Sequence, residues 1–140
     1  MGRKMTSLSA GYAICGALKE GLGDKINGIY PIICMDKDSK YPFINYVRQN
    51  SEREATKSPY NADQDSCSIS VRVYDDNYER GLEIIEEARA ILEGKVFVYT
   101  DKDDPSSTLT VKCAKVSSSD EDWTENGAYM QEIVITCKIR

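Results

Sequence analysis

Two adjoining segments decide the fold, Cys67-Ser-Ile-Ser-Val-Arg-Val-Tyr74 and Gly81-Leu-Glu-Ile-Ile-Glu-Glu-Ala-Arg-Ala-Ile-Leu92. In the first segment apolar residues alternate with polar ones, which is typical of a strand with one buried face. In the second, apolar residues recur every three or four positions, which predicts an amphipathic helix. Asp76 followed by Glu79 indicates a capping box at its start, and Gly94 a left-handed residue at its end. The stretch therefore predicts architecture and carries no chemistry of its own.

The composition fits one globular domain over residues 1–140, with 41% hydrophobic and 29% charged residues. The net charge is −5, and no basic cluster extends beyond Arg3-Lys4. Because phosphate binding depends on clustered Lys and Arg, this argues against specific nucleic-acid binding and favours a protein partner. No apolar run reaches the roughly 20 residues that a membrane helix needs. We therefore expect a soluble, intracellular protein without membrane contact.

The residues most often used in metal sites and nucleophilic catalysis are absent or unfavourably placed. The chain has no histidine, which removes the imidazole ligand and the usual activating base. The five cysteines form no C-x-x-C pair and lie within apolar segments. They are expected to be reduced and buried, and no zinc site or cofactor is predicted.

The remaining elements follow from hydrophobic period and from prolines. A first helix is expected to begin at Thr6 or Ser7 and to end at residues 21–23. Strands are expected at 26–34, 42–48, 96–99, 109–113 and 129–140. Residues 117–127 read as an acidic turn between the last two strands. The buried stripe of the first helix is expected to be Leu8, Tyr12, Cys15, Leu18 and Leu22.

This order of elements predicts an α+β fold, a mostly antiparallel twisted β-sheet with two helices packed on one face. Pro31 would confine its strand to a sheet edge, and the last strand would lie near the centre beside its sequence neighbour. The face opposite the helices would be mixed and partly apolar, so we expect subunit association to cover it. It would carry Ser70, Tyr74, Met130, Val134 and Thr136.

Four motifs in this order resemble the tail completion, or tail terminator, family of long-tailed bacteriophages and prophages. They are Gly28-Ile-Tyr-Pro31, Tyr41-Pro-Phe-Ile-Asn-Tyr46, Ser70-Val-Arg-Val-Tyr74 leading through Tyr78 into a helix, and Asp122-Trp-Thr-Glu-Asn-Gly-Ala-Tyr129. The similarity covers most of the chain, from the first helix to the C-terminus. Its specificity lies in the order and spacing of the motifs, since each motif alone is weak.

The resemblance implies a small subunit that forms a ring with copies of itself, commonly a hexamer. Such a ring caps the tail tube, ends its polymerisation and presents a surface to the head-neck connector protein. The role needs no catalytic residue and no cofactor. It also implies assembly in the cytoplasm of the bacterial host and a place in the virion tail. The polar segment 49–65 and the connection 100–108 depart from the family pattern.

The segment 49–65 carries hardly any apolar side chain and is expected to be a long loop. It reads either as a functional loop or as a passive hairpin extension. In the functional reading, its charged and aromatic residues contact a neighbouring subunit or the tail tube. The candidate interface residues are Arg53, Glu54, Lys57 and Tyr60.

Two other classes of function stay open on the sequence. One is a carboxylate-dependent enzyme, using either residues 120–122 or the acidic residues of 101–104. The other is a free-standing small-ligand-binding or regulatory α+β module, for which a deep apolar pocket would be the distinguishing feature.

Overall fold

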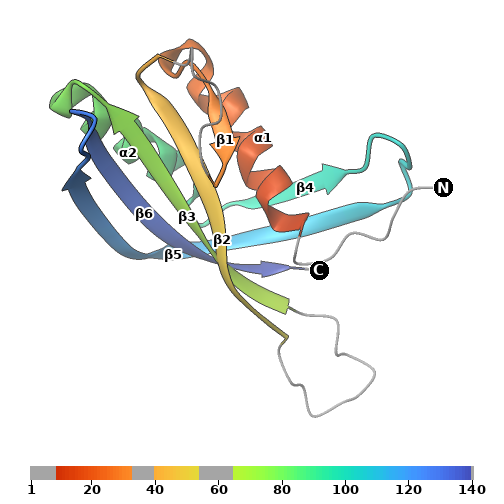
Figure 1. The fold of residues 1–140 in the computed structure, drawn as a ribbon. Helices are drawn as coiled ribbons and strands as arrows, with labels where there is room; N and C mark the ends of the chain where they lie inside the picture. The colour runs from red at the N-terminus through yellow and green to blue at the C-terminus, as the bar shows by residue number, and fades with distance from the viewer. Residues whose placement is uncertain (1–8, 33–39, 54–64, 140) are drawn as a thin grey trace.

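The computed structural model describes residues 9–32, 40–53 and 65–139. Two α-helices and six strands follow the predicted order (Figure 1). Their bounds are α1 Ala10–Leu22, the 3-10 turn η2 Gly23–Lys25, β1 Ile29–Pro31, β2 Phe43–Arg53, β3 Asp65–Asp75, α2 Tyr78–Leu92, β4 Val96–Thr100, β5 Thr108–Trp123 and β6 Tyr129–Ile139. The α+β class predicted from the sequence is confirmed.

The six strands form one curled sheet in the order β1-β2-β3-β6-β5-β4. The short strand β1 pairs with β2 in parallel, and the other pairings are antiparallel. The sheet is therefore mixed. The sequence predicts a mostly antiparallel sheet, and the pair of β1 with β2 is the parallel exception. The predicted edge position of Pro31 and the central position of β6 are confirmed.

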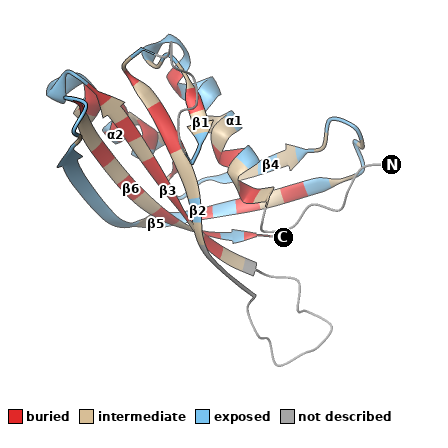
Figure 2. Ribbon diagram, viewed as in Figure 1, coloured by how far each residue is buried: buried red, intermediate tan, exposed pale blue. Residues whose placement is uncertain are grey.

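Both helices pack on the same face of the sheet, which is called the helix face here, and the other is called the open face (Figure 1). Figure 2 shows buried residues alternating with partly exposed ones along β3 and β6. Cys67, Ile69, Val71 and Val73 of β3 are buried as the period-two pattern predicts. Along β6, every second residue from Gln131 to Ile139 joins them.

Helix α1 buries a different stripe from the one expected. Leu18 and Leu22 are buried as predicted, but Tyr12 is 46% exposed and Cys15 is only partly buried. Their places are taken by small residues and one isoleucine, Ala10, Ala13 and Ile14. The helix begins after Ser9, and the expected start at Thr6 or Ser7, like Leu8, lies outside the described residues. It ends at Gly23, whose φ of 54° explains the predicted glycine stop.

Helix α2 begins one residue later than the predicted capping box. Asn77, not Asp76, is the N-cap, and its Oδ1 accepts a hydrogen bond from the Arg80 amide at 3.1 Å. The buried stripe is Gly81, Ile84, Ile85, Ala88 and Leu92. The predicted left-handed Gly94 is confirmed, with a φ of 72°.

Two polar segments expected to be irregular are partly strand. β2 continues to Arg53 and β3 begins at Asp65, so only 54–64 of the expected loop falls outside the described residues. β5 runs on to Trp123 through the serines and acidic residues expected to form a turn. Register shifts near Val116 let β5 pair with β6 along the whole length of β6. The hydrogen bonds of this ladder stabilise the second half of β5, which has little apolar pattern.

Three cysteines line up across β3, β6 and β5 within the core. Cys67, Cys113 and Cys137 are each at most 2% exposed, and the Sγ atoms of Cys113 and Cys137 lie 3.6 Å apart as free thiols. The contact with Cys113, together with burial, raises the pKa of the Cys137 thiol.

Because burial shields these three thiols from the reagent, they should resist alkylation in the native protein at neutral pH and react fully in urea. Mass spectrometry of peptides after a brief iodoacetamide pulse measures this. Rapid native labelling of Cys67 and Cys137 would contradict the packing described here.

Candidate functional site

Aromatic side chains gather at one end of the sheet, where β2 and β6 begin and β3 and β5 end. Ring contacts link them in two groups on either side of the sheet. We call this region the aromatic end. Its members are Tyr30, Tyr41, Phe43, Tyr74, Tyr78, Trp123 and Tyr129.

The first group is a row of rings on the open face. Phe43 is stacked between Tyr41 and Tyr74, with ring centroids 5.5 and 5.2 Å away. Tyr30 of the edge strand meets Phe43 edge-on at 6.1 Å. Offset stacks and edge-on pairs are the favoured geometries of aromatic rings, so the row holds itself in place. All four side chains remain partly exposed.

The second group surrounds Tyr129, the first residue of β6. Trp123 and Tyr78 both meet its ring edge-on, at 4.8 and 5.3 Å. Trp123 is 56% exposed and Tyr78 is 37% exposed. The Tyr78 hydroxyl donates a 2.8 Å hydrogen bond to Glu121. A large, fixed and exposed tryptophan is the residue type most enriched at the energetic centres of protein interfaces.

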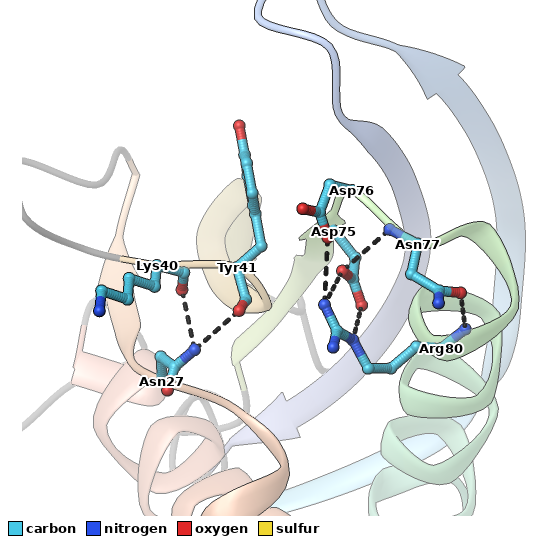
Figure 3. A network of polar contacts seen from close by, with 7 residues as sticks. All are labelled: Asn27, Lys40, Tyr41, Asp75, Asp76, Asn77 and Arg80. Carbon is cyan, nitrogen blue, oxygen red and sulfur yellow. Dashed lines mark hydrogen bonds and ion pairs between the residues drawn. The ribbon is translucent and has the colours of Figure 1, made fainter.

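Asn27 fixes the backbone that carries Tyr41. Its Nδ2 donates hydrogen bonds to the carbonyl oxygens of Lys40 and Tyr41, at 3.1 and 2.8 Å (Figure 3). The backbone N–H of Asn27 also donates a hydrogen bond to the Pro42 carbonyl oxygen at 2.8 Å. Three hydrogen bonds from Asn27 thus hold the turn before β2 in place. They fix the backbone position from which the Tyr41 ring stacks on Phe43.

A buried carboxylate fixes the junction between β3 and α2, from which Tyr74 and Tyr78 project. Asp75 is fully buried, and both of its oxygens accept hydrogen bonds from Arg80, at 2.7 and 2.5 Å (Figure 3). It also accepts from the Asn77 amide at 3.1 Å. A Cβ at position 81 would lie 3.2 Å from the Asp75 Cβ, so Gly81 permits this close approach.

Burial alone would raise the pKa of Asp75, but the bonds from Arg80 and Asn77 outweigh it and hold the pKa of this carboxyl below its ordinary value. Asp75 is therefore an ionised structural anchor.

Beyond the aromatic row, the open face carries an ion pair at its centre. Glu132 of β6 accepts from Arg72 Nε at 2.5 Å and from Ser70 Oγ at 2.7 Å. Beside them Asn45 is 5% exposed, and its Oδ1 has no hydrogen-bond partner among the described residues. An unpaired buried acceptor is costly, so Asn45 lowers the stability of the chain.

The carboxyl groups have properties unlike those of a general acid. Wherever a carboxyl group of the described residues departs clearly from its ordinary pKa, the pKa is lowered. Bonds from Gln131 and Tyr78 lower the pKa of Glu121, the central residue of the 120–122 cluster. Asp101 and Asp104 accept local backbone bonds in a turn. A general acid needs a raised pKa, so no group found here fits the role, and the enzyme reading stays a hypothesis.

Three surface hollows of the described chain are open depressions of about 390, 440 and 600 Å³. The first lies between α1 and β1–β2 and is lined by Tyr12, Pro31, Ile32 and Tyr46, among others. An enclosed apolar pocket is the feature that a small-ligand module calls for. None of these three hollows has that form. No group of three potential metal-ligating side chains occurs within the described ranges.

Of the candidate interface residues inferred from the sequence, one lies among the described residues, and it stands away from the aromatic end. Arg53 is the last residue of β2, at the opposite end of the hairpin, while Glu54, Lys57 and Tyr60 lie outside the described residues. Sequence reasoning singled out this polar segment and missed the aromatic end as a site. A usable signal was present, because the aromatic residues stand at strand ends beside Pro31, Pro42 and the acidic turn.

The chain matches none of the protein-family models and none of the curated proteins with which it was compared. Among the described helices, none has the length and apolar character needed to cross a bilayer.

Proposed function

We propose that this chain is a phage or prophage tail terminator subunit, which forms a ring, caps the tail tube and joins it to the head-neck connector. The observation that carries the proposal is the aromatic end. The four motifs on which the resemblance rests are distant in sequence, yet each contributes at least one ring to this cluster. In this proposal the cluster contacts a neighbouring subunit or the tube.

The chemistry of the aromatic end supports a contact with protein. Trp, Tyr and Arg dominate the energetic centres of interfaces, and Trp123, Tyr78 and the half-exposed Arg80 lie together here. The rings are already held by stacking and by the Asn27 and Asp75 networks. Little side-chain entropy is then lost on binding, which favours affinity.

The open face supports the same reading. Its aromatic row and the Arg72–Glu132 pair give this face a mixed polarity. Interfaces of non-obligate assemblies have such a composition, with apolar centres and satisfied polar groups around them. The segment 54–64, which connects β2 to β3 in the sequence, remains a second proposed contact.

The experiment is assembly of the purified chain, followed by light scattering, negative-stain microscopy and mixing with the cognate tail tube protein. Wild-type protein is expected to form rings and to fix tube length. Trp123→Ala should weaken the assembly by about 30-fold or more, because an interface centre contributes roughly 2 kcal/mol or more. Tyr12→Ala is the matched control, since Tyr12 is also about half exposed and lies near the other end of β5, stacked on Tyr99.

Two outcomes would contradict the proposal. One is a chain that stays monomeric at all concentrations and leaves tube length unchanged. The other is an equal loss of assembly in Trp123→Ala and Tyr12→Ala, which would remove the aromatic end from the interface. Circular dichroism on both variants verifies that each remains folded.

A further inference from the structure

On the edge strand β4, the backbone groups turned away from β5 have no strand partner among the described residues, and they follow a defined pattern. Figure 1 shows β4 at the outer edge of the sheet beside β5, its only partner among the described strands. The Lys95 carbonyl accepts from the Cys113 amide, and the Asp101 amide donates to the Ser107 carbonyl. Backbone groups alternate in direction along a strand, so odd-numbered residues bond β5. The amides and carbonyls of Val96, Val98 and Thr100 therefore point outward.

The side chains of this edge are unusually apolar for a strand at a sheet margin. Val96 is 55% exposed and Val98 is 65% exposed. Natural edge strands are normally blunted by a charge, a proline or a bulge. Within 96–100, Val-Phe-Val-Tyr-Thr, none of these devices is present. The charges stand at the two ends instead, Lys95 on one side and Asp101 on the other.

The sequence Lys95-Val-Phe-Val-Tyr-Thr-Asp101 is complementary to itself when read in the opposite direction. In an antiparallel pair centred on Val98, that residue faces its own copy and Val96 faces Thr100. These are the residues whose backbone groups point outward, so each pairing gives two hydrogen bonds. Phe97 then faces Tyr99, and Lys95 faces Asp101. Aromatic pairs and opposite charges are the favoured cross-strand neighbours.

We infer that β4 pairs with β4 of a second copy of this chain, antiparallel and about a two-fold axis at Val98. One sheet then continues across both copies, and the exposed valines of the two strands lie together on its open face. Because the contact is isologous, it closes after two copies and does not propagate. The inference is independent of the proposed tail function, since the aromatic end lies elsewhere on the sheet.

Disulfide trapping tests the register directly. Paired residues at the axis have Cα atoms about 5.5 Å apart, within the range that a disulfide spans. Val98→Cys should therefore give a covalent dimer on mild oxidation with copper phenanthroline. Val96→Cys is the matched control, because its two copies would lie four residues apart along the strands, about 14 Å. It should give no more dimer than wild type, which retains the native cysteines.

Charge exchange tests the same register without covalent chemistry. Lys95→Asp places two carboxylates opposite each other at both ends of the pair, and Asp101→Lys places two ammonium groups there. Each single variant should weaken the dimer by about 10-fold or more in sedimentation analysis. The double variant Lys95→Asp/Asp101→Lys restores opposite charges and should recover most of the loss. Asp101→Lys also loses the turn bond to the Asp103 amide, so the double variant is compared with that single variant.

Three results would overturn the inference. One is a monomer mass for the wild type at every protein concentration up to about 100 μM. The same mass is expected if residues 1–8 of the same chain occupy this edge. Another is equal trapping at positions 96 and 98. The third is a double variant as weak as its single parents. If Trp123→Ala abolishes rings but preserves trapping at position 98, the two contacts are separate.

Discussion

Replacing Leu18 with alanine is expected to lower the free energy of unfolding by about 3–5 kcal/mol. Leu18 lies in the middle of α1, is fully buried and belongs to the one core that joins both helices to the sheet. Alanine is the best helix former, so the helix itself loses nothing by the change. The cost is the lost transfer energy of the side chain together with the cavity left under the helix.

Urea unfolding followed by circular dichroism measures this loss, with an unchanged m-value showing that the native state keeps its compactness. Glu20→Ala is the control, because it lies two residues further on the exposed side of the same helix. Its effect should stay within about 0.5 kcal/mol. A comparable small loss for Leu18→Ala would mean that α1 does not cover the sheet.

The sequence predicts those elements whose burial follows a simple period. β3 and β6 bury every second residue as their alternating pattern predicts. In α2 the apolar pattern predicts the buried Ile84, Ile85 and Leu92, but Tyr78 and Leu82, also expected to face inward, are not fully buried. In α1 the inward positions include Ala10 and Ala13, which carry little hydrophobic signal, so the bulkier Tyr12 misled the assignment.

Strands stabilised by their neighbours are harder to predict. The stretch 117–123 of β5 is exposed and polar, and its strand conformation depends on pairing with residues 129–134 of β6. β1 has three residues and is set by its parallel pairing with β2. The aromatic end presents the same difficulty, since its rings come from six elements and the turn before β2, and meet only through tertiary structure. The sequence does show the aromatic residues themselves, which lie within the four ordered motifs of the resemblance.

Arg80→Ala is expected to destabilise the protein by about 2–4 kcal/mol at pH 7. Removing one partner of a fully buried ion pair costs about 3–5 kcal/mol, because the other charge is left buried without compensation. Asp75 is fully buried, but the Arg80 side chain is 46% exposed, so solvent screens part of the pair and the expected loss is smaller. Lys25→Ala is the control. It breaks the 2.6 Å pair with Glu87, whose partners are 59% and 35% exposed, and should cost less than about 1 kcal/mol.

The pH dependence of this loss identifies the buried carboxylate as its cause. In the wild type the pKa of Asp75 lies below its ordinary value of 3.8, so its ionisation stabilises the native state above that pH. That stabilisation is lost as the pH falls through the folded-state pKa. In Arg80→Ala burial dominates and raises the pKa of Asp75, so the variant gains stability when Asp75 takes up a proton.

The difference in unfolding free energy between wild type and Arg80→Ala should therefore shrink as the pH is lowered from 7 toward 4. For Lys25→Ala, an exposed pair, it should change little over that range. A difference for Arg80→Ala that stays constant from pH 7 to 4 would mean that Asp75 is not ionised and buried at the end of β3, and the anchor assigned to the aromatic end would be wrong.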